Sequence, residues 1–257
     1  MTKTPNRNDN DAAGLSRRSL FKTAGAVGVA AAVPSPVPGQ ENAGARSAAE
    51  PAGPPTATGA GIRFFLTEPE ALFVAAAADR LIPPDETWPG AAWAGVPEYI
   101  DRQLAGGYGQ GARMFLDGPW QEGLPQQGYQ LRYTPAEIFR VGIAAVRRHV
   151  AEAYNGREFY DLAPEVQDEV LKGLETGTIK FEELPAPLFF ETLLAKTVEG
   201  YFADPAYGGN RDMTSWRMIG FPGAYAQFAY LVEEWGMTYD RPPMSIAQSA
   251  AAHHDHD

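Results

Sequence analysis

Histidine, the side chain best suited to proton transfer near neutral pH, is scarce in this chain. Of four histidines, only His149 lies outside the C-terminal tail. As a general base it would need a nucleophile or a substrate within hydrogen-bond reach, and no neighbouring motif supplies one. It follows Arg147 and Arg148 near the C-terminus of an expected helix, where a partial positive charge is favoured. We therefore interpret His149 as a boundary or surface residue rather than a catalytic base.

The other histidines belong to the terminal run His253-His254-Asp255-His256-Asp257. Imidazole and carboxylate groups together can chelate a transition metal. No packing pattern precedes the run, however, and polar termini of this kind are commonly poorly ordered. We predict a disordered tail over residues 241–257 with incidental metal affinity, and no defined metal site.

The remaining chemistry-bearing groups support no catalytic mechanism. Paired carboxylates occur at Glu182-Glu183 and Glu233-Glu234, but adjacent helix positions point in different directions and form no dyad by themselves. The absence of cysteine excludes a thiolate nucleophile, a disulfide framework and Cys-ligated metal or haem sites. The glycine-rich stretch 106–128 lacks the frame of a phosphate-binding loop. We expect no catalytic, cofactor-binding or metal-binding residues in this chain.

The densest group of residues with special backbone properties is the stretch 204–212. Pro205 fixes its own φ, whereas Gly208, Gly209 and Asn210 tolerate positive φ, so a compact loop is predicted. The residues that follow are bulky, apolar and cationic, as at many protein–protein contacts. Two interpretations stay open: the loop docks another subunit, or it packs on its own domain with Arg211 bonding helix-end carbonyls. The predicted partner interface comprises Tyr207, Gly208, Gly209, Asn210, Arg211, Asp212, Trp216, Ile219 and Pro222.

A helical framework is expected to position this loop. Capping boxes begin at Thr67 and Thr134, each with Glu three residues later, and apolar stripes at helical spacing follow them. No convincing alternating strand pattern and no internal repeat occur. We predict an all-α single domain of five or six helices with long irregular loops over residues 61–240. The helices are expected near 67–82, 96–104, 134–154, 164–176, 187–202 and 225–235.

The N-terminal 45 residues resemble an export signal of the twin-arginine type. Arg17 and Arg18 precede a mildly apolar run of 11 residues, which is too short for a bilayer span of roughly 20 residues. Ala43-Gly44-Ala45 offers a cleavage site, and residues 46–60 read as a flexible linker. Such signals address folded proteins. We therefore expect twin-arginine export to the periplasm, a route that benefits a protein escorting a cofactor-loaded partner.

The charge of the chain limits its partners. Its formal net charge of −11 argues against binding nucleic acid, whose phosphates require a basic surface. At 257 residues, the chain is long enough for one good-sized domain with a real core plus extra segments.

A set of short segments follows one family pattern in order over roughly residues 62–225. They are Ala78–Pro83, Pro89–Ala91, Gly95–Asp101, Tyr108–Arg113, Gly118-Pro119, Gly128–Gln130, Tyr133–Glu137, Gln167–Leu171, Tyr207–Asp212, Trp216, Ile219-Gly220 and Pro222-Gly223. In these the chain resembles the small, third subunit of gluconate 2-dehydrogenase and its relatives, such as the fructose dehydrogenase small subunit. Ala163 departs from the polar N-cap expected before Pro164, and residues 237–257 match nothing in the pattern.

The resemblance implies a non-catalytic subunit of a periplasmic, membrane-bound sugar or sugar-acid dehydrogenase. In such complexes a large flavoprotein subunit carries FAD, and a multihaem cytochrome c subunit passes electrons to quinone. The small subunit carries the twin-arginine signal and is associated with maturation and export of the flavoprotein. A stand-alone exported α-helical binding protein is the alternative, and an independent hydrolase, for which no nucleophile arrangement speaks, ranks last.

Overall fold

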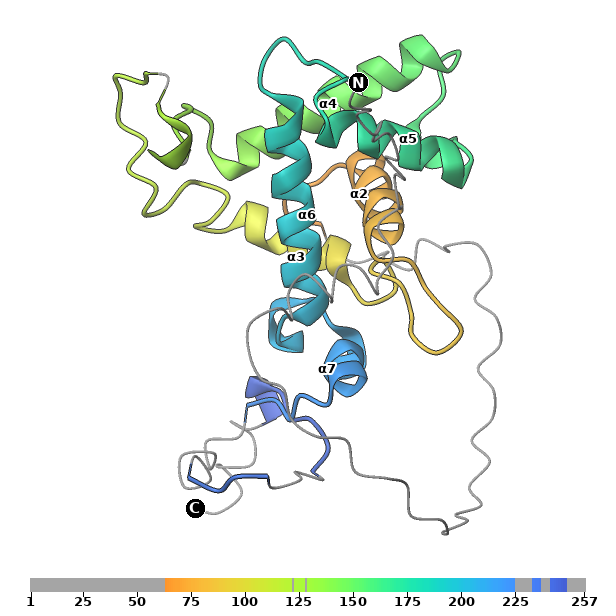
Figure 1. Ribbon diagram of the computed structural model, residues 1–257, viewed down its shortest axis with the longest axis vertical. Helices are drawn as coiled ribbons and strands as arrows, with labels where there is room; N and C mark the ends of the chain where they lie inside the picture. The colour runs from red at the N-terminus through yellow and green to blue at the C-terminus, as the bar shows by residue number, and fades with distance from the viewer. Residues whose placement is uncertain (1–62, 122, 128, 225–232, 237–240, 249–257) are drawn as a thin grey trace, which may run out of the picture. The chain divides into compact units, whose positions relative to one another are not determined.

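The computed structural model describes residues 63–121, 123–127, 129–224, 233–236 and 241–248 (Figure 1). The expected signal with Arg17 and Arg18, the linker, most of the helix expected at 225–235 and the histidine run lie outside these residues. Within them the fold consists of α-helices and short 3₁₀ turns, without a β-strand. The prediction of an all-α domain is confirmed.

Besides a helical turn at residues 246–248, six α-helices lie in the described residues. They are α2 (Glu68–Leu81), α3 (Val96–Ala105), α4 (Pro135–Ala153), α5 (Pro164–Glu175), α6 (Ala186–Phe202) and α7 (Thr214–Ile219). The 3₁₀ turns are η1 (Pro125–Gln127), η2 (Phe159–Asp161), η3 (Pro205–Tyr207) and η4 (Arg211–Met213). Among these helices none combines the length and the apolar character that a membrane span requires.

Two helices begin as their capping sequences predict. At α4 the Thr134 hydroxyl accepts the Glu137 N–H at 3.3 Å, and the Glu137 carboxylate accepts the Thr134 N–H at 2.8 Å. At α2 both the N–H and the hydroxyl of Thr67 donate to Glu70, at 2.8 and 2.7 Å. By contrast, Ala163 begins α5 with no side-chain cap, so that helix lacks about 1 kcal/mol of end stabilisation.

Helix α6 lies at the centre of the domain, with α2, α3, α4 and α5 packed around it (Figure 1). Its buried Phe189 ring contacts the rings of Phe73 and Phe139, with centroids 6.2 and 6.0 Å apart. Phe159 in η2 completes the cluster, edge-on to Phe73 at 5.1 Å. These four rings are 0–1% exposed and join four parts of the chain into one core.

Two glycines bring the helices close together. A Cβ at Gly142 in α4 would lie 2.2 Å from Cδ2 of Phe189, and a Cβ at Gly200 in α6 would lie 2.7 Å from Cδ1 of Tyr99 in α3. No real Cβ fits at such distances, so glycine is what lets α6 cross its neighbours this closely.

The first residues of the domain are bound to α3 and α4. The buried carboxylate of Asp101 accepts the backbone N–H groups of Phe64, Phe65 and Leu66 at 2.7, 2.9 and 2.7 Å. Arg140 donates to the Phe65 carbonyl at 2.9 Å and lies 4.1 Å from the centroid of the Phe65 ring. This N-terminal strap (residues 64–66) is therefore part of the folded body.

Candidate functional site

The predicted loop forms the end of the domain that follows α6, and we call residues 204–224 the docking loop. Its backbone passes through η3, η4 and α7 and takes positive φ at Gly208, Asn210, Asp212 and Met213. The loop is as compact as the sequence predicts. The short helix α7 within it was not predicted.

Backbone-to-backbone packing holds the docking loop on the helices. A Cβ at Gly209 would lie 2.0 Å from the Gly200 carbonyl oxygen of α6, and a Cβ at Gly95 would lie 2.7 Å from the Gly208 carbonyl oxygen. The Arg211 N–H donates to the Ala94 carbonyl at 2.8 Å. Glycine is therefore needed at position 209 because the backbone passes so close to α6, and not because φ is positive there.

Asn210 holds the loop together from inside. Its side chain is fully buried, its Nδ2 donates to the Ala203 carbonyl at 2.9 Å, and its Oδ1 accepts the N–H and hydroxyl of Ser215 at 2.9 and 2.7 Å. The backbone at Asn210 is left-handed, with φ of 48°, which Asn tolerates better than most residues. This one side chain joins the end of α6 to the start of α7.

Trp216 is the second internal anchor. Its indole N–H donates to the Phe202 carbonyl at the end of α6 at 2.9 Å, and its ring meets Phe221 edge-on at 5.1 Å. The helix-end carbonyl is therefore bonded by Trp216 rather than by Arg211. The Arg211 guanidinium instead lies 5.6 Å from the centroid of the Trp93 ring.

The predicted interface residues separate into two sets. Gly209, Asn210 and Trp216 are buried within this chain and shape the loop. Tyr207 and Ile219 are each 53% exposed, and Asp212 is exposed as well; Gly208, Arg211 and Pro222 are half-buried. Both interpretations of the loop thus have a physical basis, because it packs on its own domain with one side and presents another side outward.

Two further apolar residues lie on this face, outside the predicted set of interface residues. Trp93, in the turn before α3, is 45% exposed and lies beside Arg211, and Phe221 is 44% exposed beside Trp216. Phe221 is one of the bulky apolar residues that follow the stretch 204–212 in the sequence. Trp93 lies more than a hundred residues upstream, and only the fold brings it here.

The family model described as Gluconate 2-dehydrogenase subunit 3 matches residues 68–223. This span is more than half of the 257 residues. The chain belongs to this family. A search of curated proteins and a search of solved structures each found no match. The subunit 3 match begins at the first residue of α2 and ends within the docking loop, so it contains the core helices and all the predicted interface residues.

A polar network lies beside the docking loop in this subunit 3 domain. Tyr99 donates to Glu199 at 2.6 Å, and the buried Lys196 donates to the same carboxylate and lies 3.8 Å from the centroid of the Tyr108 ring. Burial raises the pKa of Tyr108 to about 12, and burial together with Glu199 raises the pKa of Tyr99. Both phenols stay protonated at neutral pH, so neither is a general base there.

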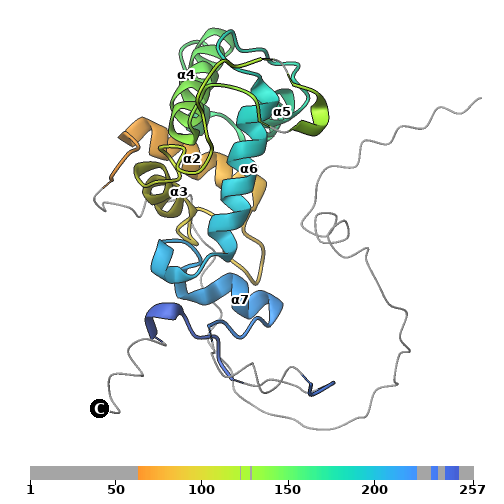
Figure 2. The same ribbon diagram turned by 90° about the vertical axis from the view of Figure 1, so that its left-hand side faces the viewer.

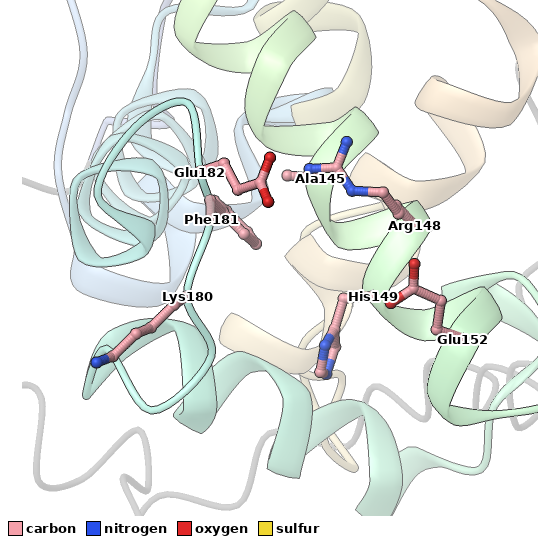
Figure 3. A pocket seen from close by; sticks show the side chains of 7 residues that line it. All are labelled: Ala145, Arg148, His149, Glu152, Lys180, Phe181 and Glu182. Atoms are coloured by element: carbon pink, nitrogen blue, oxygen red, sulfur yellow. The ribbon is translucent and has the colours of Figure 1, made fainter.

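His149 lines a hollow of about 340 Å³ between α4 and the 177–183 loop. Figure 3 shows its imidazole projecting from α4 into this space, with the Lys180 amine pointing away from it. Arg148, on the rim, is already paired with Glu183 at 2.9 Å and lowers the pKa of that carboxyl. The lining contains no Ser, Thr or Cys, and His149 is half-buried, as expected of a boundary residue.

The part of the chain described by the structure holds no group of three or more His, Cys, Asp or Glu side chains arranged for a metal ion. The terminal His/Asp run lies outside that part, and the prediction of incidental metal affinity there stays a prediction.

Proposed function

We propose that this chain is a non-catalytic small subunit of a periplasmic, membrane-bound FAD-dependent sugar or sugar-acid dehydrogenase. In this proposal it binds the large flavoprotein subunit through the outward face of the docking loop and supports its maturation and stability. It also carries the twin-arginine signal for both chains. FAD belongs to the large subunit, and haem c to a multihaem cytochrome c subunit.

Membership of the gluconate 2-dehydrogenase subunit 3 family is the observation that carries this proposal. The family description names one subunit of a dehydrogenase with other subunits. A subunit needs a surface that contacts its partners, and the docking loop is an exposed surface of the described residues whose composition resembles that of an interface. Tyr207 and Arg211 are of types enriched at interfaces, and Ile219 adds exposed apolar surface. The buried Asn210 and Trp216 hold the loop in place.

The export part of the proposal rests on the N-terminal sequence. Arg17 and Arg18 precede an apolar run typical of a twin-arginine signal. That route carries folded proteins. A flavoprotein folded around FAD without a signal of its own could therefore cross the membrane bound to this chain.

Co-purification tests the docking part. The wild-type chain is expected to purify from its own host with a large flavoprotein chain, identified by mass spectrometry and by the FAD absorbance. Ile219→Asp changes an exposed side chain, and Arg211→Ala removes the half-buried guanidinium that lies near the Trp93 ring. Each should weaken association at least tenfold in a titration with the purified large chain. Phe115→Asp introduces the same charge at a 90% exposed residue on the loop between α3 and α4 and should leave it unchanged.

Replacing Arg17 and Arg18 together by Lys tests the export part. Both chains are then expected to remain in the cytoplasm, assayed by fractionation. Undiminished association of the docking-loop variants would overturn the interface, and normal export of the flavoprotein in a deletion strain would overturn the escort role. A chain that purifies alone would instead favour the stand-alone binding protein.

A further inference from the structure

The C-terminal segment 241–248 lies against the docking loop, although the family match ends at residue 223. In Figure 1 and Figure 2 its dark blue ribbon lies close to α7. Met244 N–H donates to the Pro222 carbonyl at 3.1 Å, and the Ala224 N–H donates to the Met244 carbonyl at 2.7 Å. These two bonds form a short parallel bridge between Gly223 and Met244.

Glycine at 223 is required for this contact. Its φ is 86°, and a Cβ there would lie 2.2 Å from the Met244 carbonyl oxygen. The positive φ and the missing side chain at Gly223 therefore allow the backbone of the segment to pack directly on the end of the docking loop.

Asp204 fixes the segment at a second point. The carboxylate is 8% exposed; its Oδ1 accepts the Ala206 N–H at 2.9 Å and its Oδ2 accepts the Ile246 N–H at 2.8 Å. The same carboxylate therefore caps η3, which ends at Tyr207, and anchors Ile246. Tyr207 ends the turn that Asp204 caps, and Ile246 is bonded to the same carboxylate, although 39 positions separate the two residues in the sequence.

The anchored segment presents an apolar outer side. Ser245 is buried, whereas the neighbouring Ile246 is 48% exposed. Residues 241–248 contain one charged residue, the exposed Arg241, and no Asp or Glu, in a chain whose formal net charge is −11. Exposed apolar residues with Arg nearby, but without Asp, Glu or Lys, are typical of an interface.

We infer that segment 241–248 is part of the docking surface and that Ile246 contacts the same large flavoprotein subunit as Tyr207 and Ile219. This inference rests on the proposed function. The segment is continuous with the docking-loop face, because the Asp204 carboxylate accepts an N–H group from each of them, Ala206 in the loop and Ile246 in the segment. The docking loop carries the cationic Arg211 and Arg217 and one exposed carboxylate, Asp212. The matching surface of the large subunit is therefore an apolar patch with carboxylates opposite the two arginines and a cationic group opposite Asp212.

Ile246→Asp tests the inference in the full-length chain. The backbone anchors remain, and the thermal midpoint should change by no more than about 2 °C, as expected of an exposed position. The dissociation constant for the purified large subunit should rise at least tenfold. Ile246→Val, which keeps an apolar surface, should stay within about threefold of wild type, and Phe115→Asp serves as the matched control.

The outcomes separate this inference from the proposed function. If Ile219→Asp weakens association and Ile246→Asp does not, the C-terminal segment lies outside the interface and the inference is wrong while the proposed function stands. If wild type does not bind a flavoprotein at all, the proposed function fails. Weakening by both aspartate variants, with Ile246→Val and Phe115→Asp near wild type, supports the inference.

Discussion

The carboxylate of Asp101 accepts the backbone N–H of Leu66 at 2.7 Å, although the two residues are 35 positions apart in the sequence. Asp101 is 5% exposed, and its two oxygens also accept the N–H groups of Phe64 and Phe65. Hydrogen bonds to an ionised acceptor are about twice as strong as neutral ones. The strap is therefore held by a buried negative charge on α3.

Asp101→Asn should release the strap. The amide offers one acceptor oxygen instead of two, so at least one strap N–H loses its partner inside the protein. We expect a loss of about 1–3 kcal/mol in the free energy of unfolding and faster amide exchange at residues 64–66. Urea unfolding and hydrogen exchange measure these changes. Asp117→Asn, at an exposed carboxylate, should leave both unchanged.

Glu70 should make the free energy of unfolding of the domain depend on pH in the acid range. Burial alone would raise the pKa of the Glu70 carboxyl, but hydrogen bonds from Thr67 and Arg140 outweigh burial and hold that pKa below its usual value of 4.5. A lowered folded-state pKa adds stability that is complete above the unfolded-state pKa and is lost as pH falls through the folded-state pKa.

Glu70→Gln should therefore reduce the free energy of unfolding at pH 7 by about 1–2 kcal/mol. The difference from wild type should shrink as pH falls below about 4.5. Denaturant titrations between neutral and acid pH measure it. A gap between the two proteins that stays constant with pH would contradict the assignment. Glu175→Gln, from the exposed pair with Lys172, is the control.

Asn210→Gly separates the hydrogen bonds of Asn210 from its backbone shape. Glycine accepts the left-handed φ of 48° without cost but removes the bonds to Ala203 and Ser215. We expect a loss of about 1–3 kcal/mol and faster exchange of the Ser215 amide. Asp212→Gly, at an exposed residue with φ of 55°, should be neutral or slightly stabilising.

Gly142→Ala should show whether the crossing of α4 and α6 is as close as described. Alanine favours a helix over glycine by about 1 kcal/mol, but its Cβ would meet the Phe189 ring, and overpacking costs about 1–3 kcal/mol. We expect net destabilisation in thermal unfolding. Adding Phe189→Leu should relieve the clash, so the double variant should lose less than the sum of the single losses. Simple additivity would argue against the contact.

Helix starts were the most predictable part of the fold, because each has a local cause. Thr134 and Glu137 sit at the spacing of a capping box, and α4 begins where that spacing predicts. The buried face of α6 was less predictable. Leu194 and Val198 are apolar residues at helical spacing, which predicts that they face the core, but they are half-buried, whereas Thr197 and Gly200 are buried. This helix is apolar on most sides, so the close approach of Gly200 to Tyr99 decides its orientation.

The docking loop was predictable in place and in compactness, and less so in the role of each residue. Tyr207 and Ile219 are exposed, but Asn210 and Trp216 bond inward to groups near the end of α6. Trp93 lies at this face because the neighbouring Ala94 carbonyl accepts the Arg211 N–H. Ile246 lies there because its N–H donates to the Asp204 carboxylate. Such long-range contacts have no signature in the spacing of residues along the chain.

The glycine contacts of the docking loop also have a thermodynamic consequence. Gly209 lies on the carbonyl of Gly200, and Gly95 on that of Gly208, with no side chain between the two backbones. Any rearrangement of the loop would break these backbone contacts with α6 and with the residue before α3. The backbone of the docking loop is therefore preorganised for a partner, and its ordering should cost little free energy on binding. Most of the entropy lost at this surface should come from the side chains of residues such as Tyr207 and Arg211.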